Sequence, residues 1–432
     1  MRPKARLVAL LGALAASLAT GEASASPQEV IGFGFRSLAM GNTGAAVGEG
    51  VDAVYANPAL LSTAREMELQ LGTLGASFDL NAAGPGLPEP LVAYPALQAN
   101  TIGGILPLPF GGPLKDRVAI GVGFLTPYDI VVRGRILYPE KPQYLLADRV
   151  QSVAVQAGIG LDIGYGIRIG GGFAALAALT GSVIVATDDA GRLGTTVEDT
   201  LVASYMPIVG ASWEFGDEKY RIGATFRGEL VGRFNVVIEA ENLGQITIPP
   251  LNISGIAQYD PMQVALEVAR IRGDWRVAVG ATYKHWQAYP GPVEATVRCA
   301  DAVFPDVPCD PLVPADPAFS PVVAPRAGVE RILPLSATAE IGLRGGYGFE
   351  PSPAPEQTGR ESYFDNHRSV FSLGYGLRFT EPLGLSFDGF AQVQWLHARS
   401  HEKRTAEGAL VDGVVDTSGV ILAGGTSASV RF

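Results

Sequence analysis

The chain has 432 residues, of which 47% are hydrophobic and only 17% are charged, and 54 of them are glycine. This composition suits neither a disordered chain nor an average soluble enzyme, and the net charge of −11 argues against nucleic-acid binding. At this length the number of domains has to come from the sequence pattern, because a large closed barrel can be one domain of this size.

The first 25 residues have the features of a secretory signal peptide. Three basic residues within the first six precede a short apolar run over 7–18, and the Ala-Ser-Ala of 23–25 offers a small-residue cleavage site. A membrane anchor is the alternative, but the run is shorter than the roughly 20 residues that a spanning helix needs. We therefore predict a cleaved signal peptide over 1–25. No later stretch is long and apolar enough for a spanning helix.

From residue 66 to the C-terminus, the dominant signal is the alternation of apolar and polar residues. In VFSLGYGLRF, Phe371, Leu373 and Tyr375 share one face, whereas Ser372 and Arg378 share the other. The same division recurs in YRIGATFRGEL, WRVAVGATYKHW and ATAEIGLRGGYGF, with charges of both signs on the polar face. One face therefore suits lipid, and the other suits a lumen lined by charge pairs.

A soluble β-sandwich also alternates, so segment length and punctuation have to distinguish the two folds. The segments run past ten residues, and short turns alternate with long loops, as in outer-membrane barrels. Strands are predicted near 66–79, 99–110, 117–131, 150–163, 167–186, 201–216, 219–238, 258–271, 273–290, 325–333, 337–350, 366–380, 384–400 and 415–432. These are fourteen strands, an even number, as closure of an antiparallel barrel needs. The predicted fold class is all-β, a 14-stranded antiparallel transmembrane β-barrel over 66–432.

The chain ends in SASVRF, with Val430 and Phe432 on one face of the last strand. A terminal strand that finishes in an aromatic residue is typical of barrels inserted by the outer-membrane barrel assembly machinery. We therefore expect this machinery and outer-membrane lipid as partners. The expected location is the bacterial cell outer membrane, with the protein as a monomer.

Residues 26–65 do not alternate and are rich in glycine and alanine, with two short helix-like stretches. A barrel of fourteen strands encloses a lumen too wide for its own side chains to fill. We therefore predict that this segment is a small N-terminal hatch, or plug, inside the lumen. A periplasmic tail is the alternative.

The two cysteines, Cys299 and Cys309, lie ten residues apart in a proline-rich loop. In an exported protein such a close pair predicts a disulfide, because the compartment is oxidising. A metal site is the alternative, but only three aspartates lie nearby, at Asp301, Asp306 and Asp310. We expect no metal here.

The run GFGFRSLAMGNTGAAVGEGVDAVYANPALL resembles the N-terminal hatch of the FadL family of outer-membrane transporters of long-chain fatty acids. The match includes the Asn-Pro-Ala motif of that family, at Asn57, Pro58 and Ala59. Further matches follow in family order in QVALEVARIRGDWRVAVGATYKHW, LRGGYGFEPSPAP and DNHRSVFSLGYGLRF. Together they cover essentially the whole mature chain. The loops at 132–149 and 291–324 depart from well-known members.

The resemblance implies facilitated diffusion of long-chain fatty acids or other hydrophobic small molecules. Such a ligand is caught between extracellular loops, enters a pocket inside the barrel, and leaves sideways through the wall when the hatch shifts. This route suits a ligand of poor water solubility, because it never crosses a continuous aqueous channel. Phe33 matches the family position that reaches the inner pocket, although an aromatic residue packed for stability would look the same.

Asn57 and Pro58 are expected to fix the hatch, because Pro58 disfavours a helical Asn57 and the Asn side chain can bond nearby backbone. An ordinary Asn-Pro turn explains the local sequence equally well. The basic residues that could neutralise a fatty-acid carboxylate from the lumen are Arg36, Arg227, Arg344 and Arg378. Lumenal arginines more often pair with Glu or Asp, so each of them has this second interpretation.

Enzymatic interpretations find little support in the sequence, and no cofactor is expected. His397 and His401 are four residues apart, but on a strand this spacing is about 13 Å, too far for one metal ion. There is no GxSxG, HExxH or P-loop motif. The alternative to a transporter is a non-transporting outer-membrane barrel that serves as a scaffold for envelope proteins.

Overall fold

A computed structural model of the chain describes residues 22–23, 27–84, 96–128, 130–131, 143–144, 153–187, 193–216, 219–241, 251–291, 293–297, 316–359, 362–381, 384–404 and 410–432. The predicted signal peptide falls almost entirely outside the described residues. Cys299 and Cys309, with their predicted disulfide, also lie outside them.

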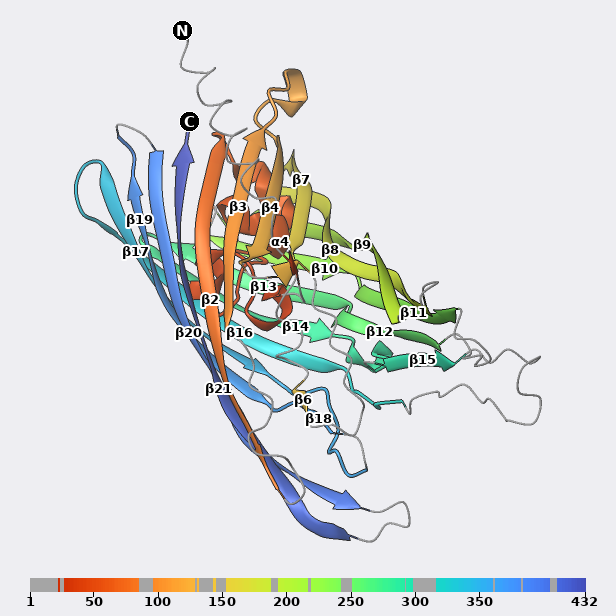
Figure 1. Cartoon of the computed structure of the whole chain (residues 1–432). Coiled ribbons are helices and arrows are strands. Elements are labelled where there is room, and N and C mark those ends of the chain that lie inside the picture. The colour runs from red at the N-terminus through yellow and green to blue at the C-terminus, as the bar shows by residue number, and fades with distance from the viewer. Residues whose placement is uncertain are drawn as a thin grey trace.

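Within these ranges the chain forms a closed barrel of fourteen strands (Figure 1). Eleven are single segments: β2 (Glu68–Ala83), β3 (Leu97–Pro107), β4 (Val118–Pro127), β7 (Ala154–Gly164), β8 (Ile167–Thr187), β9 (Leu193–Phe215), β16 (Val322–Pro334), β17 (Ala339–Glu350), β19 (Arg368–Phe379), β20 (Gly384–Arg404) and β21 (Leu410–Arg431). Three are interrupted: β10 (Tyr220–Arg227) with β11 (Leu230–Glu241), β12 (Leu251–Asp260) with β13 (Gln263–Arg272), and β14 (Trp275–Lys284) with β15 (Val293–Val297). The predicted number of strands is confirmed. The boundaries shift by a few residues, most of all for β9, which begins at Leu193 rather than near 201.

The first and last strands close the barrel. β2 pairs antiparallel with β21 over the whole length of β2, with Leu69 opposite Val430. At the end of this ladder, the backbone N–H and C=O of Met67 and Phe432 exchange two hydrogen bonds of 3.1 Å. Consecutive strands are paired antiparallel around most of the wall. Residues 235–241 of β11 are the exception, since they pair in parallel with residues 180–186 of β8.

The alternation of the sequence becomes an outer and an inner face. On β19, Leu373 is 69% exposed while its neighbour Ser372 is 2% exposed. Large apolar side chains are exposed on the outer face in the same way on β13, β14 and β17. A lipid-facing wall of this kind accounts for part of the high hydrophobic content of the chain. None of the described helices is long and apolar enough to cross a membrane.

The N-terminal segment fills the lumen, and we call residues 27–64 the plug. It consists of single turns and short helices, which Figure 1 shows enclosed by the strands. These elements are α2 (Pro27–Val30), α3 (Phe35–Ala39), η1 (Gly50–Asp52), α4 (Ala53–Ala56) and η2 (Pro58–Thr63). Nearly all of its side chains between Val30 and Ser62 are buried.

Glycines on the inner face of the wall allow this close fit. A Cβ atom added to any of ten such glycines, on ten different strand segments, would come within 3.3 Å of a plug atom. They are Gly72, Gly103, Gly121, Gly158, Gly170, Gly210, Gly223, Gly328, Gly346 and Gly374. A side chain at these positions would push the plug away from the wall, which accounts for part of the high glycine content.

A small parallel sheet lies at the end of the lumen opposite the short turns. It pairs β6 (Gln143–Tyr144) with β18 (Tyr363–Phe364), and all three of its aromatic side chains are buried. The Tyr144 hydroxyl donates a 2.6 Å hydrogen bond to the carbonyl of Asn81, near the end of β2. The short elements β1 (Glu22–Ala23), β5 (Ile130–Val131), η3 (Gly112–Leu114) and η4 (Trp286–Ala288) complete the fold. The sheet of β6 and β18 therefore lies on the side of the plug away from the short turns (Figure 1).

Candidate functional site: the plug and its cavities

A network of buried ion pairs joins the plug to the wall. Arg36 of the plug lies 2.7 Å from Glu330 on β16, and Glu330 lies 2.7 Å from Arg344 on β17. Arg344 also pairs with Asp388 on β20. The prediction that the lumen is lined by pairs of opposite charge is therefore confirmed for these strands.

Glu49 extends this network on the plug side. Its carboxylate lies 2.9 Å from Arg378 on β19 and 3.8 Å from both Arg36 and Arg276 on β14. Burial by itself raises the pKa of Glu49, but the three guanidinium groups outweigh burial and hold this pKa well below its usual range. Glu49 therefore remains a carboxylate inside the lumen and anchors the plug to two strands.

The Asn-Pro-Ala motif lies where the plug meets β7, β8 and β9. Asn57 is fully buried and extended, and its Oδ1 accepts a 3.1 Å hydrogen bond from the N–H of Ala59 at the start of η2. Its Nδ2 donates to the carbonyls of Ala45 in the plug (2.6 Å) and Ala211 on β9 (3.0 Å). One side chain thus caps a helix, fixes a second plug segment and ties both to the wall. Pro58 and Ala59 pack on the backbone of Gly170.

Phe33, Tyr55 and Arg227 form a stack inside the lumen. The rings of Phe33 and Tyr55 meet edge to face, with their centroids 6.1 Å apart. The guanidinium of Arg227, at the end of β10, lies 4.6 Å from the centroid of the Tyr55 ring. The far edge of Phe33 rests on Gly123 of β4, where a Cβ would lie 2.9 Å from the ring. The stack therefore links β4 to β10, which is four strands further along the wall.

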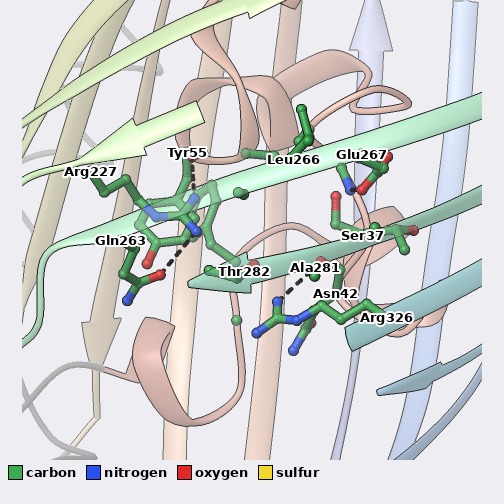
Figure 2. Close-up of a pocket in the computed structure, with 18 of the residues that line it drawn as sticks. Ser37, Asn42, Tyr55, Arg227, Gln263, Leu266, Glu267, Ala281, Thr282 and Arg326 are labelled. Atoms are coloured by element: carbon green, nitrogen blue, oxygen red, sulfur yellow. Dashed lines mark hydrogen bonds between the residues drawn. The ribbon is translucent and has the colours of Figure 1, made fainter. Parts of the chain in front are cut away.

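A cavity of about 60 Å³ lies between this stack and β13, β14 and β16 (Figure 2). Its plug side includes Phe33, Asn42, Gly44 and Tyr55, and its wall side is largely polar. The polar wall residues are Arg227, Gln263, Glu267, Thr282, Lys284 and Arg326. A cavity of this size holds only a few water molecules. No long hydrocarbon chain fits into it as it stands.

Most of the cations around this cavity have carboxylate partners. Lys284 lies 2.7 Å from Glu29 and 2.9 Å from Glu350, and Arg326 also pairs with Glu350. Arg227 differs from them. Its Nη atoms donate to the carbonyl of Tyr55 (3.2 Å) and to Gln263 (3.1 Å), as the dashed lines in Figure 2 show.

Arg227 is only 7% exposed, and its Nε has no hydrogen-bond partner. Among the described residues, no carboxylate lies within salt-bridge distance of it. The four candidate arginines thus separate. Arg36, Arg344 and Arg378 are paired with carboxylates of the network, whereas Arg227, beside the cavity, has no such pair in the described part of the chain.

Two further cavities lie towards the short turns, where both ends of the barrel sequence also lie. Outer-membrane barrels have this rim in the periplasm. One cavity of about 200 Å³ is lined by Arg36, Val47, Glu49, Glu214, Arg221, Ile271 and Arg276. A wider one of about 550 Å³ lies between the turns at the rim, and it includes Arg65, Arg168 and Tyr165. The plug therefore has open space on its periplasmic side.

Sequence reasoning did not name Glu267 or Glu330, and it placed Lys284 on the polar face of its strand without giving it a role. Glu267 and Glu330 also stand at inward positions of their strands, so alternation could have placed them in the lumen as well. Glu330 is 1% exposed and Lys284 is 2% exposed, and both bind residues of the plug. The sequence does not show which inward charges contact the plug, because residues 27–64 have no periodic pattern from which their path could be predicted.

Comparison with known proteins gives a likeness in fold. No protein-family model matches the chain, and no curated protein matches it by sequence. Among solved structures, a FadL homologue from Pseudomonas aeruginosa superimposes with a TM-score of 0.60 at 13% identity, over 95% of this chain and 98% of that one. The toluene transporter TbuX of Ralstonia pickettii gives 0.53 at 14%, over 93% and 99%. The monoaromatic hydrocarbon channel CymD gives 0.51 at 15%, over 93% and 98%. This chain therefore shares the β-barrel fold of these FadL-type proteins.

Proposed function

We propose that this protein carries hydrophobic small molecules across the outer membrane, and that its preferred ligand is amphipathic, with an anionic head such as that of a long-chain fatty acid. The observation that carries this proposal is the buried guanidinium of Arg227 at the edge of an apolar cluster, with no carboxylate of the described residues within salt-bridge distance. The neighbours in fold include proteins described as a FadL homologue and as transporters or channels for toluene and other monoaromatic hydrocarbons.

The lumen around Phe33 has two chemically different sides. Towards β4, β8 and β9, Phe33 and Tyr55 belong to one apolar cluster with side chains of the wall. These wall side chains include Leu125, Leu176, Met206, Ile208 and Leu230. Towards β13 and β14, the wall carries the polar groups of the cavity. An amphiphile could lay its chain along the first side while its head faces the second.

Arg227 supplies the attraction for that head. A buried guanidinium without a carboxylate is unfavourable, and a ligand carboxylate would compensate it with a charge-assisted hydrogen bond. Lys284 cannot do this equally well, because it is held by two glutamates. A ligand without charge would form no charge-assisted hydrogen bond at Arg227. This difference separates a fatty acid from a monoaromatic hydrocarbon as the ligand.

The wall also offers a place for sideways exit. The β9–β10 ladder stops at Ile208 and Arg227, and beyond it the N–H of Gly228 bonds to the carbonyl of Pro207 (2.9 Å). Pro207 lacks an N–H, and β11 continues by pairing with β8 instead of β9. By contrast, β4 is paired with β3 and β7 over nearly its whole length. We infer that the ligand leaves at this seam between Pro207 and Gly228, directly beside Arg227.

The test of the proposed function is uptake of labelled oleate and labelled toluene by bacterial cells with and without the protein. We expect Arg227→Gln to lower oleate uptake about tenfold while toluene uptake stays unchanged, because only the acid loses a charge-assisted bond. Arg270→Gln, at an exposed position of β13, is the matched control. Equal uptake of both hydrophobes with and without the protein would refute transport and favour a scaffold.

The exit is tested by a covalent crosslink between the two sides of the seam. Ser204 and Val231 face each other across it, with Ser204 Oγ donating a 2.8 Å hydrogen bond to the Val231 carbonyl. Crosslinking the pair Ser204→Cys and Val231→Cys should stop uptake, and reduction should restore it. The control pair is Phe124→Cys with Val155→Cys, which are in register in the intact ladder of β4 and β7. Undiminished uptake through a crosslinked seam would exclude this exit.

A further inference from the structure

A thin part of the plug separates the cavity beside Phe33 from the cavity on the periplasmic side, and we call it the septum (residues 43–47). Thr43, Gly44 and Ala45 line the cavity beside Phe33, whereas Val47 lines the cavity on the periplasmic side. The cavity beside Phe33 has a volume of about 60 Å³, and the periplasmic one has a volume of about 200 Å³. The chain is one residue layer thick at this point, because the two ends of a five-residue segment face different cavities.

The wall strands agree with this order along the barrel axis. On β13, Glu267 lines the cavity beside Phe33, and Ile271 lines the cavity on the periplasmic side. These positions are about 13 Å apart along a strand, with only one inward residue between them. That residue is Ala269, and Ala278 takes the corresponding place on β14. The barrier between the two cavities is therefore short.

Small side chains make the seal. Ala46 and Val47 of the septum form a buried apolar cluster with Met40, Ala269 and Ala278. On β10, Gly223 lets the carbonyl of Ala45 approach the wall backbone directly. Few apolar atoms are buried in this seal, so the hydrophobic contribution to closure is small compared with that of a normal core.

Hydrogen bonds from the wall hold the septum in place. Glu267 accepts from the N–H of Gly44 (2.9 Å) and from the N–H of Ala46 (3.0 Å). Arg221 on β10 donates to the carbonyl of Ala46 (3.2 Å). Arg36 and Asn57, both in the plug, donate to the carbonyls of Val47 and Ala45. Glu267 therefore provides two of the bonds that tie the septum to the wall.

Glu267 has no competing partner in the described part of the chain. It is 5% exposed, and no cation lies within salt-bridge distance of it among the described residues. A buried carboxylate that is satisfied by backbone N–H groups makes charge-assisted bonds, which are the strong kind. When these bonds break, water in the two cavities can take over the freed N–H groups.

We propose that Glu267 is the latch of an axial gate. With Glu267 bound to the septum, the two cavities are separate. With Glu267 released, residues 43–47 move and the cavities join into a water-filled path along the barrel axis. This path would pass small polar solutes and ions. It is distinct from the sideways route proposed for hydrophobes, and it does not depend on the identity of the hydrophobic ligand.

The test is the KCl conductance of the purified full-length protein in planar lipid bilayers. Glu267→Gln keeps the size of the side chain but removes the charge, so the two N–H bonds weaken. We expect the probability of the conducting state to rise about tenfold or more above that of the unaltered protein. Glu340→Gln is the matched control, since Glu340 is 40% exposed and does not bind the septum. It should leave conductance at the unaltered level.

A crosslinking experiment distinguishes movement of the septum from a general destabilisation of the plug. Ala46→Cys and Ala278→Cys, placed in the Glu267→Gln protein, allow the septum to be tied to β14 by a short thiol crosslinker. The crosslink should return conductance to the unaltered level, and each single cysteine should not. Liposome entry of arabinose should follow conductance in every variant.

Two results would overturn the latch. One is equal conductance of the Glu267→Gln, Glu340→Gln and unaltered proteins. For this result to count, the change of gel mobility on heating must show that all three proteins are folded. The other is a rise in conductance that the crosslink does not reverse, which would locate the leak elsewhere. Oleate uptake measured in parallel separates the two proposals, because a failed latch leaves Arg227-dependent uptake intact.

Discussion

The carboxylate of Glu330 on β16 lies 2.7 Å from the guanidinium of Arg36 in the plug, and the two side chains are 1% and 6% exposed. Neither group can exchange its partner for water without moving the plug. A buried pair of this kind specifies position more than it adds stability, because desolvation offsets most of the attraction. The plug therefore has a defined orientation inside the barrel.

Breaking this pair should loosen the plug. We expect Glu330→Ala to lower the free energy of local opening of plug residues 36–63 by about 3–5 kcal/mol, because it leaves Arg36 and Arg344 buried without this carboxylate. The measurement is hydrogen exchange of plug peptides by mass spectrometry. The double variant Arg36→Met with Glu330→Leu removes both charges and should recover much of the loss. No change in exchange for Glu330→Ala would contradict this role.

Asn57 gives a sharper test, because its side chain has two separable functions. Asn57→Asp keeps the acceptor that caps η2 but loses the donor to Ala45 and Ala211. We expect Asn57→Asp to destabilise the plug at least as much as Asn57→Ala, by about 1–3 kcal/mol, because both leave buried carbonyls without a donor. Thermal unfolding in detergent measures this. If Asn57→Asp behaved like the unaltered protein, capping alone would explain the motif.

The fit between plug and wall predicts opposite outcomes for two neighbouring glycines on β8. A Cβ at Gly170 would collide with the backbone of Pro58 and Ala59, whereas a Cβ at Gly171 would meet only one carbonyl oxygen, at 3.9 Å. Gly170→Ala should therefore cost about 1–3 kcal/mol or increase leakage past the plug, and Gly171→Ala should do neither. Thermal unfolding and KCl conductance of the two variants check this. Equal behaviour of the two would mean that the plug does not press on β8.

The barrel could be predicted from the sequence because its physics is periodic. Alternation places Ser372 inside and Leu373 outside, whichever strands lie next to them. The fourteen strands and their inner and outer faces can therefore be predicted without knowing how the strands pair. The plug has no such period. Its position comes from single long-range contacts such as Arg36 with Glu330 and Asn57 with Ala211, more than 150 residues apart in each case. The motif therefore marked the right segment, but not its partners.

The same limit applies to the arginines. Sequence reasoning could not separate Arg227 from Arg36, Arg344 and Arg378, because all four stand at positions that the lumen can accommodate. What distinguishes Arg227 is the absence of a carboxylate within reach among the described residues. That is a property of three-dimensional neighbours. The strand interruption at Gly228 was also missed, since one strand was predicted over 219–238 across it.

Asp52 in the plug predicts a dependence of plug stability on pH. Its carboxyl is 3% exposed and accepts a 2.9 Å hydrogen bond from the N–H of Ser37. Burial, helped by the charge of Asp388, raises the pKa of Asp52 to about 7, against the hydrogen bond from Ser37 and the charges of Arg36 and Arg344. The folded protein therefore holds a proton on Asp52 more tightly than the unfolded chain does.

The sign follows from this difference. Between about pH 4, where the unfolded carboxyl ionises, and about pH 7, the folded state binds more protons, so stability falls as the pH rises. Above about pH 7 both states are ionised and the penalty is constant, up to about 4 kcal/mol. Asp52→Asn carries no such penalty. It should match the unaltered protein near pH 4 and exceed it in thermal stability at pH 8. A stability difference between the two proteins that is the same at both pH values would show that Asp52 does not titrate in this range.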